Sequence, residues 1–145
     1  MKAVSKSLVA LMFVVLPVVA NAVDKNSSPE NAEVFITTPK DGEELSNPVV
    51  VQFGIKGMEV VKAGTQTPNT GHHHLLIDAA LPALLPALDQ PIAKDANHMH
   101  FGGGQTEATL TLAPGKHTLQ LLLGDGNHVP HHPAVASKVI SITVK

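Results

Sequence analysis

The stretch Thr106–Leu123, TEATLTLAPGKHTLQLLL, decides the fold of this 145-residue chain. In its first half every second residue is apolar, so one face of an extended strand would consist of Ala108, Leu110 and Leu112. A second apolar run, Lys116–Leu123, follows after a tight Ala-Pro-Gly turn. Alternation with a period of two, interrupted by turn residues, predicts β-strands.

The same pattern recurs along the rest of the chain. Further runs bounded by turn residues are Val34–Thr38, Val49–Ile55, His72–Asp78 and Ser137–Val144. Prolines in the segment 79–97 disfavour a central strand, and we expect a crossing loop there, with a helical turn or a short edge strand near Ile92. Six firm strands and one weak one predict an all-β fold, an immunoglobulin-like antiparallel β-sandwich of about seven strands. A small closed barrel is the competing architecture.

The amino-terminal residues have the pattern of a secretory signal peptide. Lys2 and Lys6 precede the apolar run Leu8–Val19, which is too short to span a bilayer, and a small-residue Ala-Asn-Ala sequence ends at Ala22. We therefore expect a signal peptide over residues 1–22, a flexible leader over 23–33 and a single β-sandwich domain over 34–145. The expected location is the periplasm, with no membrane span.

Composition excludes several classes of function. The chain has no cysteine, so thiolate catalysis, disulfides and a blue-copper centre are excluded. It also lacks arginine, tryptophan and tyrosine, and the expected mature chain carries eight lysines against 12 acidic residues. Nucleic acid is therefore not an expected partner. Polar chemistry is left largely to nine histidines, all of which lie after the signal peptide.

The histidines fall into groups that suit a metal site. They are His72-His73-His74, His98-Met99-His100, the isolated His117, and His128 with His131-His132. Residues i and i+2 of a strand point to the same side, so the two rings of a His-x-His unit can reach one ion. In a sandwich with this strand order, three of the groups gather at one end, while His117 falls at the other end as a bystander. The predicted ligands are His72, His74, His98, His100 and His128, with His131 and His132 as reserve ligands or rim residues.

Copper is favoured over zinc as the expected ion. Neutral imidazole binds both metals, and the thioethers of Met58 and Met99 would favour copper, particularly Cu⁺, although core packing is the other interpretation of both residues. Asp78 and the pair Asp125 and Asn127 could orient imidazoles, with turn formation as the alternative for the latter pair. The glycines at 102–104 are interpreted as a bend that lets backbone approach the histidines.

Three long motifs resemble a family of exported bacterial proteins known as a domain of unknown function. They are FITTPKDGEELSNPVVVQFGIKGMEV, GHHHLLID, and NHMHFGGGQTEATLTLAPGKHTLQLLLGDGNHVPHHP, and together they extend over roughly Val34–Lys145. The resemblance implies a periplasmic β-sandwich-like domain and no particular activity. The His-Met-His fragment is also similar to patches in periplasmic copper chaperones, whose remaining pattern is absent here.

Three functional hypotheses follow from these observations. The leading one is a periplasmic metal-binding domain, for copper before zinc, that sequesters or delivers an ion without catalysis. The second is a non-catalytic immunoglobulin-like adaptor that binds another envelope protein, with the histidines as polar loop residues. The third is an enzyme that uses an open histidine-bound metal. The residues alone do not decide whether the domain catalyses a reaction.

Overall fold

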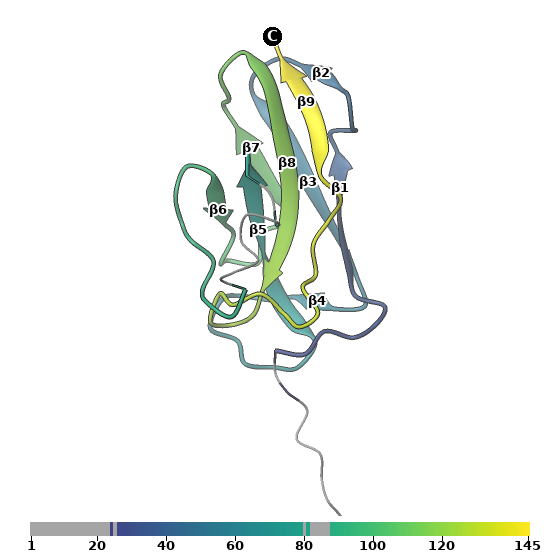
Figure 1. The fold of residues 1–145 in the computed structure, drawn as a ribbon, viewed down its shortest axis with the longest axis vertical. Coiled ribbons are helices and arrows are strands. Elements are labelled where there is room, and N and C mark those ends of the chain that lie inside the picture. Colours follow the sequence, from purple (N-terminus) through teal and green to yellow (C-terminus); the bar gives the residue numbers. More distant parts are fainter. Residues whose placement is uncertain (1–23, 25, 80, 82–87) are drawn as a thin grey trace, which may run out of the picture.

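The chain folds into two packed β-sheets, as shown by a computed structural model that describes residues 24, 26–79, 81 and 88–145 (Figure 1). The strands of this described part are β1 (Glu33–Thr38), β2 (Glu44–Leu45), β3 (Val49–Lys56), β4 (Glu59–Val60), β5 (Thr70–Ile77), β6 (His98–His100), β7 (Glu107–Leu110), β8 (Gly115–Gly124) and β9 (Ile140–Val144). The expected signal peptide at residues 1–22 lies outside the described residues. No helix within the described ranges has the length and apolar character that crossing a membrane requires.

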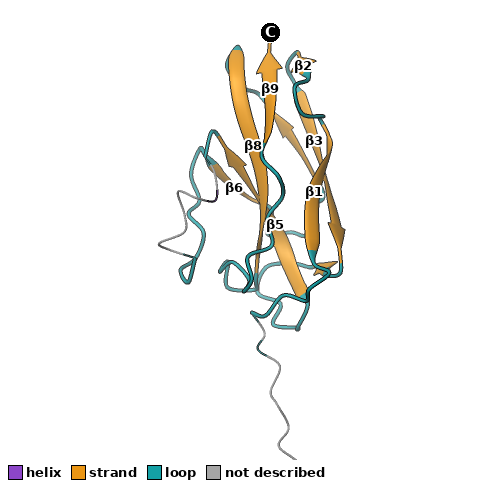
Figure 2. Ribbon diagram, turned by 45° about the vertical axis from the view of Figure 1, so that its right-hand side comes forward, coloured by secondary structure: helices purple, strands orange, loops and turns teal. Residues whose placement is uncertain are grey.

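The strand order is that of an immunoglobulin-like sandwich. One sheet has the order β1-β3-β7, and the other has the order β2-β9-β8-β5-β4, with β6 paired to β5 beside β4. The long strand β8 is antiparallel to both of its neighbours, β5 and β9. Loops connect the strands of the two layers (Figure 2). The all-β sandwich predicted from the alternating runs is therefore confirmed.

The hydrophobic core lies between the two sheets and follows the alternation of the sequence. β3 and β8 contribute three residues each, and β5, β7 and β9 contribute two each; those of β3, β7 and β8 are Val49, Val51, Phe53, Ala108, Leu110, Leu119, Leu121 and Leu123. Ile55 and Leu112, which continue the predicted apolar faces, are partly buried and pack against this core. The predicted core faces of Val49–Ile55 and Thr106–Leu112 are thus confirmed.

The short strands differ from the sequence-based expectation. Ile92 lies in a loop, and the additional strand beside β5 is β6, which starts at His98. Backbone pairing with β5 holds β6, so its position depends on long-range contacts rather than on local propensity. The stretch 23–33 was expected to be a flexible leader, but within it the Ser28 amide donates to the carbonyl of His132, and β1 already begins at Glu33.

The connections that carry the histidines meet at one end of the sandwich. β8 ends and β5 begins there, at the end opposite the C-terminus (Figure 1). Two described residues of the segment between β5 and β6 are bound to this sheet and to the turn after β8. The Leu81 amide donates to the side chain of Gln120, and the Ile92 amide donates to the carbonyl of His128.

Candidate metal centre

β5 sends its three consecutive histidines to opposite faces of its sheet. His73 faces the core between the sheets, where its ring centroid lies 5.1 Å from that of Phe53. His72 and His74 therefore point to the outer face, as the period-two alternation predicted. All eight residues of β5 are buried, because the opposite sheet covers one face and loops cover the other.

Two further histidines reach the outer face from other segments. His100 ends β6 directly beside His74 in the antiparallel register of β5 and β6. His128 lies in the turn after β8, where Oδ1 of Asp125 accepts hydrogen bonds from the amides of Asn127 and Val129. The backbone of His128 has a φ of 68°, a left-handed conformation that is uncommon for a residue other than glycine. Local turn bonds thus hold His128 in a conformation that places its ring against His72 and His100.

Glycines make room for two of these rings. A Cβ atom on Gly124 would lie 2.8 Å from Nε2 of His74, and one on Gly102 would lie closer still to Cε1 of His100. Both contacts are shorter than a methyl group tolerates, so a side chain at either position would push an imidazole aside. The interpretation of Gly102 as a point of close backbone approach to the histidines is supported.

Four histidines form one compact group that could hold a metal ion. One nitrogen from each of His72, His74, His100 and His128 lies within 4.8 Å of the corresponding nitrogens of the other three. Nε2 of His72 is 3.0 Å from Nδ1 of His128 and 3.1 Å from Nε2 of His74. Tetrahedral coordination with metal–nitrogen bonds of about 2.0–2.1 Å would separate the nitrogens by roughly 3.3 Å. The group therefore already has nearly the dimensions of an ion-binding site.

Hydrogen bonds among the four rings do not give every ring nitrogen a partner. A neutral imidazole has one N–H and one lone pair, so Nε2 of His72 can act as a donor to one neighbour or as an acceptor, and not as both. Nδ1 of His72, Nδ1 of His74 and Nε2 of His100 are buried and have no partner within the described residues. A cation at the centre would accept one lone pair from each of the four rings at once. Hydrogen bonds among the same rings cannot use all four lone pairs together. The donor set therefore fits a transition metal ion.

The electrostatics of the group keep its buried rings neutral. Burial lowers the pKa of His72 to about 4 and that of His74 to about 2, and the neighbouring imidazoles add to both shifts. The pKa of His100 is also lowered, first by burial and then by His128 and Lys94. Asp125 acts in the opposite direction on His72. Lone pairs of these rings are consequently available at neutral pH, which is the form that binds a metal.

The structure does not bring the other three predicted ligands into this group. His98 pairs with Leu76, two positions along β6 from His100, and its Nδ1 is 2.7 Å from a carboxylate oxygen of Asp95. His131 is buried apart from the group, with Nε2 3.1 Å from the carbonyl oxygen of Thr70. His132 is exposed. The sequence showed that three histidine groups meet at one end, but it could not show which ring of each group faces inward.

Asp78 and His117 form a separate pair at the other end of β8. Nδ1 of His117 is 2.8 Å from Oδ2 of Asp78, and Nε2 is 2.8 Å from the carbonyl oxygen of Ala113. His117 therefore lies away from the group, as its position just after the Ala-Pro-Gly turn predicted. The expectation that Asp78 orients the outward-facing imidazoles is wrong, because a positive φ of 54° at the end of β5 turns this residue out of the strand.

Neither methionine that suggested copper lies with the imidazoles. Met58 and Met99 are partly buried and pack against the hydrophobic core. Met99 neighbours His100 on β6 and pairs with Leu75, whose side chain belongs to that core. The alternation that turns His100 outward thus turns Met99 inward, so the ordinary core interpretation of both residues is supported. The candidate centre consists of imidazoles alone.

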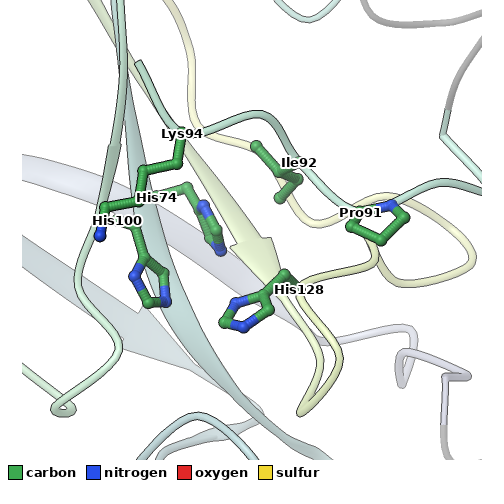
Figure 3. A pocket seen from close by; sticks show the side chains of 6 residues that line it. All are labelled: His74, Pro91, Ile92, Lys94, His100 and His128. Atoms are coloured by element: carbon green, nitrogen blue, oxygen red, sulfur yellow. The ribbon is translucent and has the colours of Figure 1, made fainter. Parts of the chain in front are cut away.

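The group opens on a hollow that the sequence did not indicate. His74, His100 and His128 line a space of about 250 Å³ together with Pro91, Ile92 and Lys94 (Figure 3). The latter three residues belong to the loop before β6 and carry no motif. Their contribution depends on the path of this loop over the sheet, which local sequence does not specify.

Fold and site together define an immunoglobulin-like β-sandwich with a histidine cluster that could hold a metal ion. The chain belongs to the family Domain of unknown function (DUF4399), whose model matches residues 51–145. This match supports the predicted kind of family over the part of the chain that contains all nine histidines.

Comparison with solved structures adds a likeness in fold. The chain is similar to the fibronectin(III)-like modules of Clostridium thermocellum CbhA, with 14% sequence identity and a TM-score of 0.45. The alignment covers 77% of this chain and 94% of that chain. A search of curated proteins finds no match.

Proposed function

We propose that this protein is a periplasmic metal-binding domain that sequesters or delivers a divalent transition metal ion, copper before zinc. The observation that carries the proposal is the compact group of four imidazoles, each of which offers one nitrogen within 4.8 Å of the corresponding nitrogens of the other three. The proposed ligands are His72, His74, His100 and His128. The periplasmic location rests on the signal-peptide pattern of residues 1–22.

The donor set supports the order of metals. Four imidazole nitrogens without a thioether suit Cu²⁺ and Zn²⁺, and sites of this kind bind Cu²⁺ more tightly than Zn²⁺. Selection of Cu⁺ depended on a methionine ligand, so the proposal is now for the divalent ion. A tetragonal arrangement of bound nitrogens would indicate Cu²⁺, and a tetrahedral one would indicate Zn²⁺.

The surroundings of the group support reversible binding. Stable metal sites usually fix each histidine through a hydrogen bond from its second ring nitrogen, and loss of that bond costs about 10–100-fold in affinity. In the described part of the chain, Nδ1 of His72 and Nδ1 of His74 have no such acceptor. An ion in this group would also border the hollow lined by His74, His100 and His128. Both features suit an ion that is taken up and released.

Calorimetric titration of the untagged apo protein with Cu²⁺ and with Zn²⁺ tests the proposal. We expect one ion per chain and loss of this binding in the double variant His100→Ala, His128→Ala. The matched control is His98→Ala, His132→Ala, which removes two histidines outside the group and should bind normally. Equal loss of binding in both variants, or no binding by the wild type, would overturn the proposed site.

Elemental analysis and intact mass measurement test the biological part of the proposal. Protein recovered from the periplasm without a tag should begin at Val23 and contain close to one equivalent of copper or zinc. A chain that retains residues 1–22, or that is recovered from the cytoplasm, would contradict the proposed location. Protein recovered from the periplasm without either metal would contradict the proposed sequestration or delivery.

A further inference from the structure

The hollow beside the imidazoles provides space for a ligand in addition to the ion. Its volume of about 250 Å³ lies against three of the four proposed ligands. This volume corresponds to roughly eight water molecules at about 30 Å³ each, which is enough for a small organic ion. An ion held by four rings would thus have one side accessible to a non-protein donor, provided that the proposed function is correct.

The charges around the hollow favour an anion as that donor. Neutral imidazoles leave the charge of a divalent ion uncompensated, and the exposed Lys94 adds a positive charge on the side of His100. The acidic group that acts on His72, Asp125, does not line the hollow, and its Oδ1 accepts hydrogen bonds from two backbone amides.

The opposite wall of the hollow is apolar and fixed in place. Pro91 and Ile92 line it (Figure 3), and the amide of Ile92 donates to the carbonyl of His128 over 2.9 Å. This backbone bond ties the apolar wall to one of the proposed ligands. A molecule that fits has a negative group toward the ion and Lys94, and a short alkyl group toward Ile92.

We propose that the metal-loaded domain binds a small aliphatic carboxylate in this hollow, with Lys94 and Ile92 as its recognition residues. A carboxylate oxygen would complete the coordination of the ion, and Lys94 would attract the charge. The alkyl group would pack on Pro91 and Ile92. The inference assigns the ion a partner ligand of defined chemistry and rests on the proposed metal site.

Azide and propionate serve as probes for the Cu²⁺-loaded protein. Azide on Cu²⁺ gives a charge-transfer absorption band in the near ultraviolet, and propionate should displace it competitively. The variant Lys94→Met should weaken both anions about three- to fivefold, the size expected for a partly exposed charge interaction. Lys116→Met, which removes an exposed lysine at the opposite end of β8, is the matched control and should leave both affinities unchanged.

The variant Ile92→Ala separates the two recognition elements. It retains the backbone amide and removes three carbons, so it should weaken propionate about threefold to tenfold through lost apolar contact and leave azide unchanged. Calorimetry of Cu²⁺ binding is carried out first on every variant. If no variant and no wild-type protein binds Cu²⁺, the proposed metal site fails. If Cu²⁺ binds but azide and propionate do not, or Lys94→Met and Ile92→Ala match the control, this inference alone is overturned.

Discussion

The two faces of β5 place chemically identical side chains in opposite situations. His72 and His74 on the outer face and His73 on the inner face are all nearly inaccessible to solvent. The outer rings lie among other imidazoles, within reach of a shared ion. The inner ring packs against Phe53, and neither of its nitrogens has a hydrogen-bond partner within the described chain. Burial alone therefore does not distinguish a histidine that could bind an ion from one whose unpaired nitrogens only destabilise the fold.

The difference lies in what can satisfy the buried nitrogens. An unpaired polar group in the interior costs about 1–3 kcal/mol, and both faces of β5 carry such groups. On the outer face one cation can accept a lone pair from each of the four rings, and this gain favours binding. On the inner face no such compensation is in place, and burial alone lowers the pKa of His73 to about 4. The following predictions test this contrast, beginning with the largest effect.

Substitution on the two faces should separate metal binding from stability. His74→Ala should weaken Cu²⁺ or Zn²⁺ binding by at least about a hundredfold, because loss of a ligand exceeds the 10–100-fold cost of losing an outer-shell partner. His73→Leu should leave the affinity within about threefold of the wild type. Calorimetric titration of both variants measures the contrast. Similar losses in both would mean that β5 affects the ion through its backbone and not through its outward rings.

Metal ions should stabilise the fold through the outer face. At a free Zn²⁺ concentration of about 100 times the dissociation constant, linkage predicts about 2.7 kcal/mol of additional unfolding free energy. Urea unfolding with Zn²⁺ and with a chelator measures this gain. The variant His72→Ala, His74→Ala should lose this gain. Mg²⁺, which prefers oxygen ligands, should not stabilise the metal-free wild type. A gain that persists in the double variant would place the ion elsewhere.

The alternating pattern of the sequence predicted both faces of β5, whereas the complete site could not be predicted from it. Period-two alternation required that His72 and His74 point away from His73, and the strand order brought three histidine groups to one end. The choice of His100 rather than His98 depends on the register between β5 and β6, which is set by pairing over more than 20 residues. A shift of that register by two residues would place His98 opposite His74 in the position of His100.

The remaining residues of the site could not be predicted from the sequence because loop geometry determines their positions. The left-handed backbone of His128 and the turn bonds from Asp125 select this ring over those of His131 and His132. Lys94 and Ile92 reach the site through the path of a long connection, part of which lies outside the described residues. Side chains on loops are placed by distant contacts, and a single sequence without a motif at these positions carries no signal for them.

The inner face should tolerate an apolar residue better than it tolerates histidine. His73→Leu removes two buried nitrogens without partners and supplies a side chain of similar size beside Phe53, so we expect a gain of about 1–2 kcal/mol in unfolding free energy. Urea unfolding of the metal-free protein at pH 7 measures it. His73→Ala is the matched comparison and should destabilise the protein, because it leaves a cavity. A loss of stability in His73→Leu would show that ring packing on Phe53 outweighs the unpaired nitrogens.

A histidine with partners on both nitrogens completes the contrast, and it should give the smallest effect. Both neighbours of His117, Oδ2 of Asp78 and the carbonyl oxygen of Ala113, are acceptors, so the ring satisfies both only when it carries two protons. These contacts raise the pKa of His117 in the fold. A raised folded pKa means that the folded state binds the extra proton more tightly than the unfolded chain does. Its stabilising contribution is therefore complete below the unfolded pKa of about 6.5, and it is lost as the pH rises through the folded pKa.

His117→Gln should accordingly lower the unfolding free energy more at pH 5.5 than at pH 8.5. We expect a difference of no more than about 1 kcal/mol, because the side chain of Asp78 is 43% exposed and solvent screens the pair. Asp78→Asn retains an oxygen that can accept the Thr118 amide hydrogen bond and removes the charge, so it should reduce the same pH dependence. Urea unfolding of both variants at the two pH values provides the measurement. A larger loss at pH 8.5 would mean that the neutral ring makes the stabilising contacts, and the contrast with the buried rings of β5 would then rest on burial alone.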